Sequence, residues 1–243
     1  MKISVCIPMY NEAKIIENSA RALSDYCKDA FEDYEILFID DGSRDGCGDK
    51  VRALELPCVK VTGYEKNRGK GCAVRTGMLE ATGDLRIFTD ADLAYGTEVI
   101  GECVKIFEKN PDSDLIIGSR KLAGDGYSGY TFIRKVASKV YLCLLQMLGG
   151  FRLSDSQVGF KCFTASAAEK IFSLCETDRF AFDFEALCYA TKFGMKITEM
   201  PVKIINHGES KINVLRDSVK MFRDIIRIRR RVSRKLAELK KNA

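Results

Sequence analysis

Two aspartates separated by one residue, Asp90 and Asp92, are well suited by type and spacing to hold a divalent metal ion. They directly follow the apolar run 85–88, which favours a strand, so both carboxylates would project from a strand's end. Mg²⁺ and Mn²⁺ prefer oxygen ligands and commonly bridge one or two carboxylates to substrate phosphates. A metal held there would neutralise a departing diphosphate. We therefore expect a metal and phosphate site at this pair, although such pairs also occur as ordinary acidic surface residues.

A second acidic pair, Asp40 and Asp41, follows the strand expected at 35–39. In dinucleotide-binding folds, an acid after the second strand binds a ribose hydroxyl. Asp and Ser are also favoured as caps, because they accept hydrogen bonds from the first free amides of a helix. The two roles are compatible, with Asp40 binding a nucleotide and Asp41 or Ser43 capping the following helix.

The segment 67–71, Asn-Arg-Gly-Lys-Gly, opens another predicted helix. An anionic diphosphate would suit this position, because the helix start offers free amides, the helix dipole and the cations of Arg68 and Lys70. The alternative is a glycine turn before an ordinary helix, which would have the same sequence pattern. The spacing of this segment differs from a Walker loop, and the segment 8–12 after the first strand lacks GxGxxG. Neither a P-loop NTPase nor a nicotinamide enzyme is therefore expected.

The elements that position these loops alternate between strands and helices. Strands are expected at 3–7, 35–39, 59–62, 85–88 and 115–117, with helices at 12–27, after Ser43, and at 69–81 and 98–109. This alternation predicts an α/β fold with a mostly parallel, doubly wound sheet, whose ligands bind at the carboxyl ends of the strands. The second half predicts a long apolar helix at 132–148, a strand at 160–163, helices at 166–173 and 182–193, and a basic C-terminal helix.

Five segments together resemble the family-2 inverting glycosyltransferases, which have the GT-A fold, a Rossmann-like and mostly parallel sheet flanked by helices. The resemblance spans about residues 3–225, and the motifs occur in the family's order and spacing. Within the family they look most like the dolichyl-phosphate glucosyltransferases and polyprenyl-phosphate mannosyltransferases. The segments are Val5–Glu12, Asp40–Asp45, Asn67–Ala73, Asp90–Asp92 and Asp155–Lys161.

The resemblance implies a role for particular residues. The residues that would bind the nucleotide-sugar are Pro8, Tyr10, Glu12, Asp40, Lys70, Asp90, Gln157 and Lys161, the last two facing sugar and acceptor together with Asp155. Asp90 and Asp92 would hold Mg²⁺ or Mn²⁺, and Asp92 and Asp155 are expected to be catalytic. The mannosyl enzymes continue the metal motif as DADLQ, whereas Ala94 replaces that Gln here. The replacement removes a metal ligand and favours UDP-glucose over GDP-mannose as the expected donor.

The resemblance also implies a lipid-phosphate acceptor. A phosphate, whose second pKa is about 6, is already an anionic nucleophile at neutral pH, so no strong general base is required of the single histidine, His207. Arg120 and Arg134 match the phosphate-binding arginines of the mannosyl relatives and would hold the acceptor in line as catalytic residues, although surface salt bridges are the alternative. Ser138 and Lys211 are weaker members of the same cluster.

Basic residues concentrate in the tail. From Leu215 to the end there are eleven Lys or Arg against three acids, a net +8, so a chain of net +5 leaves −3 on its body. The expected helix 213–243 would place an apolar stripe opposite a basic one, suiting an anionic membrane surface or a partner helix, as in a homodimer or a complex with a membrane protein. The tail's one aromatic, Phe222, argues against nucleic acid. The stripes are Leu215, Val219, Phe222, Ile226, Val232, Leu236 and Leu239, and Arg216, Lys220, Arg223, Arg227, Arg230, Arg231 and Arg234.

The chain is expected to work in the cytoplasm. It shows no leader peptide, and its longest apolar stretch, 140–147, is far shorter than the roughly 20 residues that span a bilayer. The ten cysteines are scattered without a CxxC pair, which is typical of reduced thiols. The helix at 132–148, with cations at its start, would suit either the core or a lipid headgroup layer.

These features predict a GT-A domain over 1–212, with a nucleotide-sugar half at 1–125, an acceptor half at 126–212, and the basic helix 213–243. The expected reaction is metal-dependent, inverting transfer of a hexose to a polyprenyl or dolichyl phosphate at the cytoplasmic face of a membrane. One alternative is the same fold acting on a polysaccharide or soluble acceptor. Another is a non-catalytic membrane-associated scaffold, against which the acids at 40, 90, 92 and 155 argue.

Overall fold

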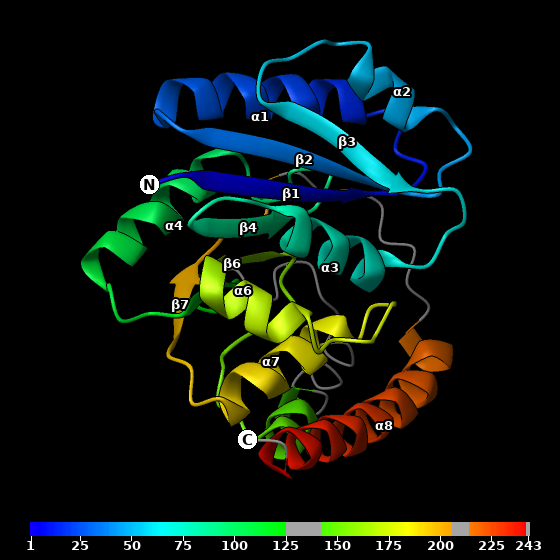
Figure 1. Cartoon of the computed structure of the whole chain (residues 1–243), viewed down its shortest axis with the longest axis vertical. Coiled ribbons are helices and arrows are strands. Elements are labelled where there is room, and N and C mark those ends of the chain that lie inside the picture. Colours follow the sequence, from blue (N-terminus) through cyan, green and yellow to red (C-terminus); the bar gives the residue numbers. More distant parts are fainter. Residues whose placement is uncertain (125–141, 206–213, 242–243) are drawn as a thin grey trace.

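The computed structural model describes residues 1–124, 142–205 and 214–241, with side chains in the last range from Arg223 onward (Figure 1). Its strands form one seven-stranded sheet of order β3-β2-β1-β4-β6-β5-β7. Only β6 runs antiparallel to its neighbours among these strands, so the prediction of a mostly parallel α/β sheet is confirmed. The strands are β1 (Ile3–Met9), β2 (Tyr34–Asp41), β3 (Val59–Tyr64), β4 (Leu85–Thr89), β5 (Leu115–Ser119), β6 (Phe160–Thr164) and β7 (Ile197–Pro201).

Helices cover both faces of the sheet (Figure 1). They are α1 (Ile16–Ala30), α2 (Cys47–Arg52), α3 (Lys70–Glu80), α4 (Glu98–Lys109), α6 (Ala165–Phe172), α7 (Phe182–Lys192) and α8 (Val214–Lys241), with a further helical stretch at 142–149. The helix expected at 132–148 is therefore observed only in its last part, and its basic start lies outside the described residues. The described ranges contain no helix with the length and apolar character needed to cross a bilayer.

Two hydrophobic cores lie on opposite faces of the sheet. One includes Leu23, Phe38 and Ile100, where α1 and α4 cover the strands. The other includes Phe163 and Tyr189, beneath α3, α6, α7 and α8. Strands β1, β4 and β5 are buried along their whole length, which is why most of their residues are apolar.

The direction of β6 brings the second half of the chain to the predicted site. Thr89 pairs with Phe160 and Phe88 with Lys161 in antiparallel register. The residues that precede β6 therefore arrive at the edge where β1, β2 and β4 end. Residues 155–159 consequently share an edge with Asp90 and Asp92.

Helix α8 packs against the protein with an apolar face that matches the predicted stripe in part, since Val232 and Leu236 belong to both. Ile225, Ile228 and Val232 are buried in the same core as α7. Ile226 is half-buried and lines a groove, and Leu239 is 45% exposed. The spacing 225, 228, 232 follows the helical period, so in the described part of α8 Ile225 and Ile228 take the buried positions that the predicted stripe gave to Ile226. The boundary expected at 213 falls outside the described residues.

Candidate active site

The loop after β4 carries Asp90 and Asp92 and meets two other segments. The Asp90 Oδ1 atom forms an ion pair with Lys70 Nζ at the start of α3, and Ala94 N donates to Asp92 Oδ1 at 3.1 Å. A Cβ atom on Gly159 would lie 2.0 Å from Asp90 Oδ2, so the backbone before β6 closely approaches this carboxylate. Three segments far apart in the sequence thus converge on Asp90.

The charges of this cluster act on one another. Burial and the charge of Asp90 raise the pKa of Asp92. Burial disfavours the charged form of Lys70, but the carboxylates of Asp90, Asp183 and Asp92 outweigh it and raise the lysine's pKa. Carboxylates outnumber cations around Lys70, which suits an added divalent ion.

A metal ion at this cluster would have two protein carboxylates. Among the described residues no three His, Cys, Asp or Glu side chains are grouped to hold a metal. Asp90 and Asp92 therefore fit an ion such as Mg²⁺, which commonly uses one or two carboxylates and completes its shell with water and substrate phosphates.

The buried Asp41 fixes the start of α3. Its carboxylate accepts hydrogen bonds from Arg68 N at 2.8 Å, from Gly69 N at 2.9 Å and from Asn67 Nδ2 at 2.8 Å. The expectation that the loop 67–71 offers free amides to a diphosphate is therefore wrong for residues 68 and 69, because a carboxylate already satisfies them. The side chains of Arg68 and Lys70 remain the candidates for binding an anion here.

The expected capping of α2 is also wrong within the described chain. Gly46 stands at the N-cap of α2 without a side-chain cap, and Asp41 serves α3. Ser43 instead accepts from Asn11 N at 3.0 Å, and its own amide donates to Asp40 Oδ1 at 2.8 Å. These bonds join the loop after β1 to the loop after β2.

The residues expected to bind the nucleotide gather at the ends of β1 and β2. Met9 pairs with Asp40 across these strands. Tyr10 is 44% exposed beside the half-buried Asp40, and Glu12 is also half-buried, while Pro8 is buried within β1. An exposed aromatic next to a carboxylate offers a stacking face and a hydrogen-bond acceptor, as a nucleoside requires.

Arg120 and Asp155 form a two-pronged ion pair at the other side of the site. Arg120 Nε and Nη2 donate to the Asp155 carboxylate at 2.7 and 3.2 Å. The backbone at this point is held in turn, since Glu199 Oε1 accepts from Ser154 N at 2.8 Å and from Asp155 N at 3.4 Å. Gln157 N also donates to Asp155 Oδ1 at 3.2 Å. The structure therefore brings together Arg120, the segment 154–157 and Glu199, which are far apart in the sequence.

Tyr95 was not predicted as a site residue. Burial raises the pKa of its phenol to about 12, with the charge of Arg120 opposing this and that of Asp90 adding to it. Tyr95 is thus near enough to both Asp90 and Arg120 for their charges to act on its phenol. Its place three residues after Asp92, in the same loop, was the available signal.

Lys161 does not face the expected sugar or acceptor. Its side chain is 1% exposed and lies 2.7 Å from Asp183 Oδ1, with Nζ donating to Val158 O at 2.7 Å. Burial raises the pKa of Asp183, while Lys161 and Lys70 oppose this shift. Lys161 is therefore an internal cation that neutralises a buried acid. Asp183 was missed as a neighbour of the site, and an acid in the first turn of an apolar helix was its signal.

Three other expected site residues, Arg134, Ser138 and Lys211, lie outside the described residues, as does His207.

A carboxylate pair after β4, joined to a lysine at the start of α3, suggests nucleotide-sugar chemistry, and comparison with known proteins agrees. The model of the family described as "Glycosyl transferase family 2" matches residues 4–172. This chain belongs to glycosyl transferase family 2. It is therefore a glycosyltransferase, as predicted.

Relatives of this family member include enzymes named "Dolichyl-phosphate beta-glucosyltransferase". The one from Dictyostelium discoideum is 32% identical over 93% of this chain and 73% of its own length. The one from Saccharomyces cerevisiae is 30% identical over 93% and 74%. The resemblance to the glucosyl branch is thus confirmed.

Solved structures share the fold at lower identity. Glucosyl-3-phosphoglycerate synthase from Mycobacterium tuberculosis, in complex with Mn²⁺, UDP and glucosyl-3-phosphoglycerate, has a TM-score of 0.69 and 19% identity over 93% of this chain and 78% of that one. Mannosyl-3-phosphoglycerate synthase from Rubrobacter xylanophilus has a TM-score of 0.67 and 18% identity over 99% and 75%. These similarities confirm the GT-A fold.

Proposed function

We propose that this glycosyltransferase moves glucose from UDP-glucose to a dolichyl or polyprenyl phosphate, with inversion and with a divalent metal ion. The observation that carries the proposal is the convergence of the Lys70–Asp90–Asp92 cluster and the Arg120–Asp155 pair on one edge of the sheet. The names of the relatives, dolichyl-phosphate beta-glucosyltransferases, support glucose as the sugar and dolichyl phosphate as the acceptor. A fold neighbour that was crystallised with UDP and Mn²⁺ agrees with the metal and the base.

The residues on the donor side would bind and neutralise the nucleotide. Tyr10 and Asp40 would contact the nucleoside, and Lys70 would contact the diphosphate. Asp90 and Asp92 would hold the metal, which supplies electrostatic stabilisation of the departing UDP. Asp41 acts indirectly, because it fixes the backbone from which Lys70 extends.

The residues on the acceptor side would position an anion. Arg120 presents a planar guanidinium that Asp155 holds in one orientation, and a guanidinium suits a phosphate's paired oxygens. An oxygen of the acceptor phosphate forms the new bond to the anomeric carbon on the face opposite UDP, and the bond from that carbon to UDP breaks. The acceptor is already anionic at neutral pH, so the reaction requires no general base.

The lipid acceptor implies that the enzyme works at a membrane. We place it on the cytoplasmic face, as a peripheral protein that contacts anionic lipid, with the 126–212 half facing the acceptor. A homodimer or a membrane-protein partner through α8 is the alternative arrangement. The residues 134, 138 and 211 would complete the acceptor site.

The test is direct turnover. Purified protein, Mn²⁺ and a short polyprenyl phosphate are incubated with UDP- and GDP-sugars, and released nucleotide and product lipid are followed by mass spectrometry. A lipid heavier by one hexose with UDP-glucose, abolished by EDTA and absent with unphosphorylated polyprenol, is expected. Preference for GDP-mannose or for a water-soluble acceptor would contradict the proposal.

A further inference from the structure

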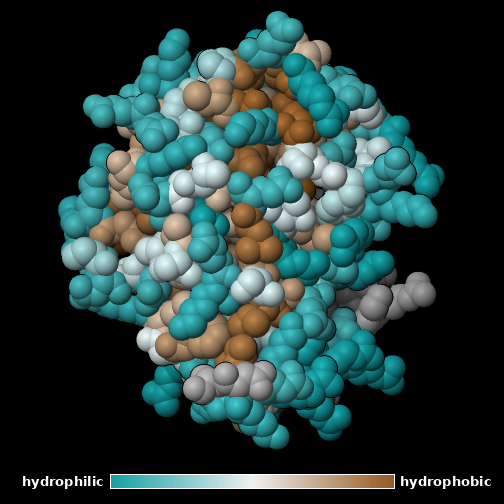
Figure 2. Space-filling view, viewed as in Figure 1, coloured by the Kyte–Doolittle hydropathy of each residue, from teal (hydrophilic) through white to brown (hydrophobic). Residues whose placement is uncertain are grey.

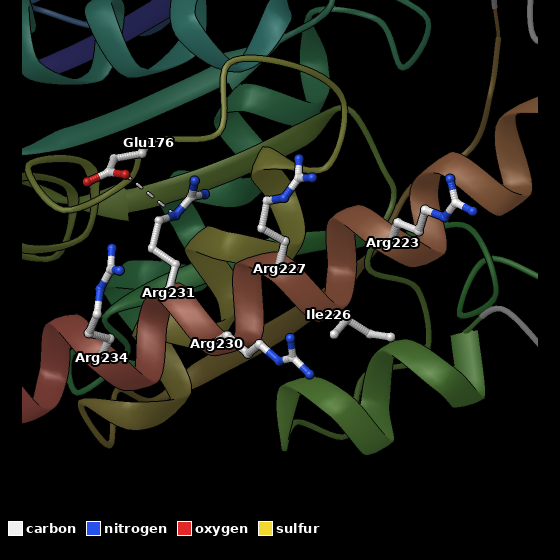
Figure 3. Close-up of a pocket in the computed structure, with 7 residues that line it drawn as sticks. All are labelled: Glu176, Arg223, Ile226, Arg227, Arg230, Arg231 and Arg234. Atoms are coloured by element: carbon white, nitrogen blue, oxygen red, sulfur yellow. Dashed lines mark ion pairs between the residues drawn. The ribbon is translucent and has the colours of Figure 1, made fainter.

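Helix α8 bears a groove lined by arginines, well away in sequence from the candidate active site. The groove has a volume of about 660 Å³. We call it the arginine groove; its cations are Arg223, Arg227, Arg230, Arg231 and Arg234. Glu176 and Ile226 complete the lining, and Arg227, Arg231 and Arg234 extend from one side of α8 toward the segment that carries Glu176 (Figure 3).

The single carboxylate among the described lining residues is already neutralised. Glu176 lies 3.7 Å from Arg231 Nε and also pairs with Lys235. Arg231 is used by the fold as well, because it lies 2.7 Å from the buried Glu185. The negative charge within the groove is thus matched by Arg231 and Lys235, which leaves the other arginines without compensation from the groove's own walls.

Those other arginines have weak partners or none that the described residues show. Arg227 lies 3.7 Å from Asp224 and Arg234 lies 3.8 Å from Glu238, with the arginine side chains 78% and 72% exposed. Exposed pairs of this length contribute little. Arg223 and Arg230 are exposed as well.

The spacing of the arginines adds repulsion. Positions 223 and 227, 227 and 231, and 230 and 234 are each four residues apart, so their side chains are neighbours on the helix surface. Like charges at this spacing destabilise a helix. An anion bound between them would relieve that repulsion.

The type of cation indicates the anion. Every cation of the groove is an arginine, whereas lysines stand at 235, 240 and 241. A guanidinium forms paired hydrogen bonds to phosphate oxygens, and it is less strongly hydrated than an ammonium. Ile226, half-buried among the arginines, adds an apolar contact beside the charges. A phosphate attached to an apolar group therefore fits this lining.

We propose that the arginine groove is a second anion site, which binds the phosphate groups of anionic phospholipids and holds α8 against the membrane surface. This inference rests on the proposed work at a membrane and deepens it, because it names the residues and the headgroup chemistry. None of the groove's lining residues belongs to the described donor or acceptor site.

The test compares two triple variants of the full chain with equal loss of charge. The groove variant is R223Q/R227Q/R230Q, and the control R229Q/K240Q/K241Q removes exposed cations outside the groove. Binding is measured by sedimentation with vesicles of phosphatidylcholine alone and of phosphatidylcholine mixed with phosphatidylserine. Pyrophosphate binding is measured separately by calorimetry, since a soluble phosphate would use the same guanidinium groups.

The groove variant should lose affinity for the mixed vesicles roughly a hundredfold, the scale expected when three cations are removed from an anionic surface. The affinity of the control for the same vesicles should fall less than about fivefold. Its three cations lie outside the groove, and salt screens their attraction to a membrane surface that they do not contact. Pyrophosphate binding that depends on the groove, without vesicle binding, would keep the anion site and assign it a soluble ligand. The proposal would be overturned if both variants lost the same affinity for the mixed vesicles. It would also be overturned if the wild-type protein bound neither the vesicles nor pyrophosphate.

The outcome is separable from that of the proposed reaction. Transfer to a short polyprenyl phosphate in detergent should be unchanged in the groove variant. If that transfer is absent from the wild-type protein while groove-dependent vesicle binding persists, the reaction is refuted and the anion site stands.

Discussion

Lys70 and Asp90 illustrate how single residues set the chemistry of the site. The ammonium pairs with one carboxylate, while Asp92 next to it keeps a raised pKa because it is buried beside a like charge. A bound metal would face both carboxylates and free Lys70 to contact phosphate.

Replacing Asp92 with Asn should remove metal binding without disturbing the loop. The Asn side chain keeps an oxygen that accepts from Ala94 N, so only the charge is lost. We expect Mn²⁺ affinity and kcat to fall by roughly a hundredfold or more, since even outer-shell changes cost 10–100-fold. Calorimetry and UDP release measure this, with Asp49→Asn, an exposed acid paired to Arg52, as the control. An unimpaired variant would remove Asp92 from the metal site.

Replacing Gly159 with Ala should displace the Asp90 carboxylate by steric contact. The added Cβ atom would lie 2.0 Å from Asp90 Oδ2, so either the carboxylate rotates or the chain before β6 shifts. Overpacking of this kind costs about 1–3 kcal/mol. We expect Mn²⁺ affinity to fall roughly tenfold. This is the lower end of the loss seen when a residue that orients a metal ligand is changed. Wild-type Mn²⁺ affinity, with a Tm change alone, would show that Asp90 does not need this contact.

At the scale of elements, the segment 174–181 connects α8 to the start of α3. Arg231 pairs with Glu185, whose carboxylate accepts from Glu176 N and Thr177 N at 3.0 and 2.7 Å. On the other side, Cys72 N donates to Asp178 O at 3.1 Å. The basic helix therefore supports the segment against which the Lys70-bearing helix begins.

Replacing Arg231 with Met should destabilise the protein. The change leaves the fully buried Glu185 without its cation, and losing one partner of a buried pair costs about 3–5 kcal/mol. The amides of Glu176 and Thr177 still donate to Glu185, so we expect the loss of unfolding free energy to lie near the lower end of this range. Urea unfolding measures it, with the exposed Arg229→Met as a control that should change stability by less than about 0.5 kcal/mol. Adding the second change Glu185→Gln should recover part of the lost stability. If the destabilisations of the two single variants simply added in the double variant, the pairing would be contradicted.

At the scale of the whole molecule, α8 belongs to the core on one face of the sheet. Its residues Ile225, Ile228 and Val232 are buried, and Figure 2 shows how hydrophilic side chains cover much of the surface around smaller apolar patches. A helix that served only as a membrane anchor would keep its apolar face for lipid. The described part of α8 instead divides its roles, with an apolar face toward the protein and arginines toward the groove.

Deleting residues 226–243 should therefore impair folding as well as membrane contact. The deletion removes Ile228 and Val232 from the core, and truncating a buried Ile alone typically costs about 2–5 kcal/mol. It also removes the Arg231 partner of Glu185. Thermal unfolding and size-exclusion chromatography should show a strongly lowered Tm or aggregation. A deletion variant with the Tm of the full chain would mean that the tail is only an appendage.

The sequence by itself determined the elements, the fold class and the family. The alternation of apolar runs with helical stretches predicted the strands near 3–7, 35–39 and 85–88, because local propensity and periodicity act over a few residues. Carboxylates at strand ends, such as Asp90 and Asp92, could be placed at one edge because parallel strands end together. The motifs, read in order, indicated the family that the comparison confirms.

Only the tertiary structure decided which side chains meet. The antiparallel direction of β6 brought Asp155 to Arg120, and the burial of Lys161 against Asp183 took that lysine away from the expected sugar. Asp41 serves α3 and not α2, and Ile225 and Ile228 are buried in α8 where the predicted stripe had Ile226. These outcomes depend on contacts between residues distant in the chain. A buried charge is costly unless it is paired, so its partner is whichever opposite charge the fold brings close. A local sequence pattern does not identify that partner.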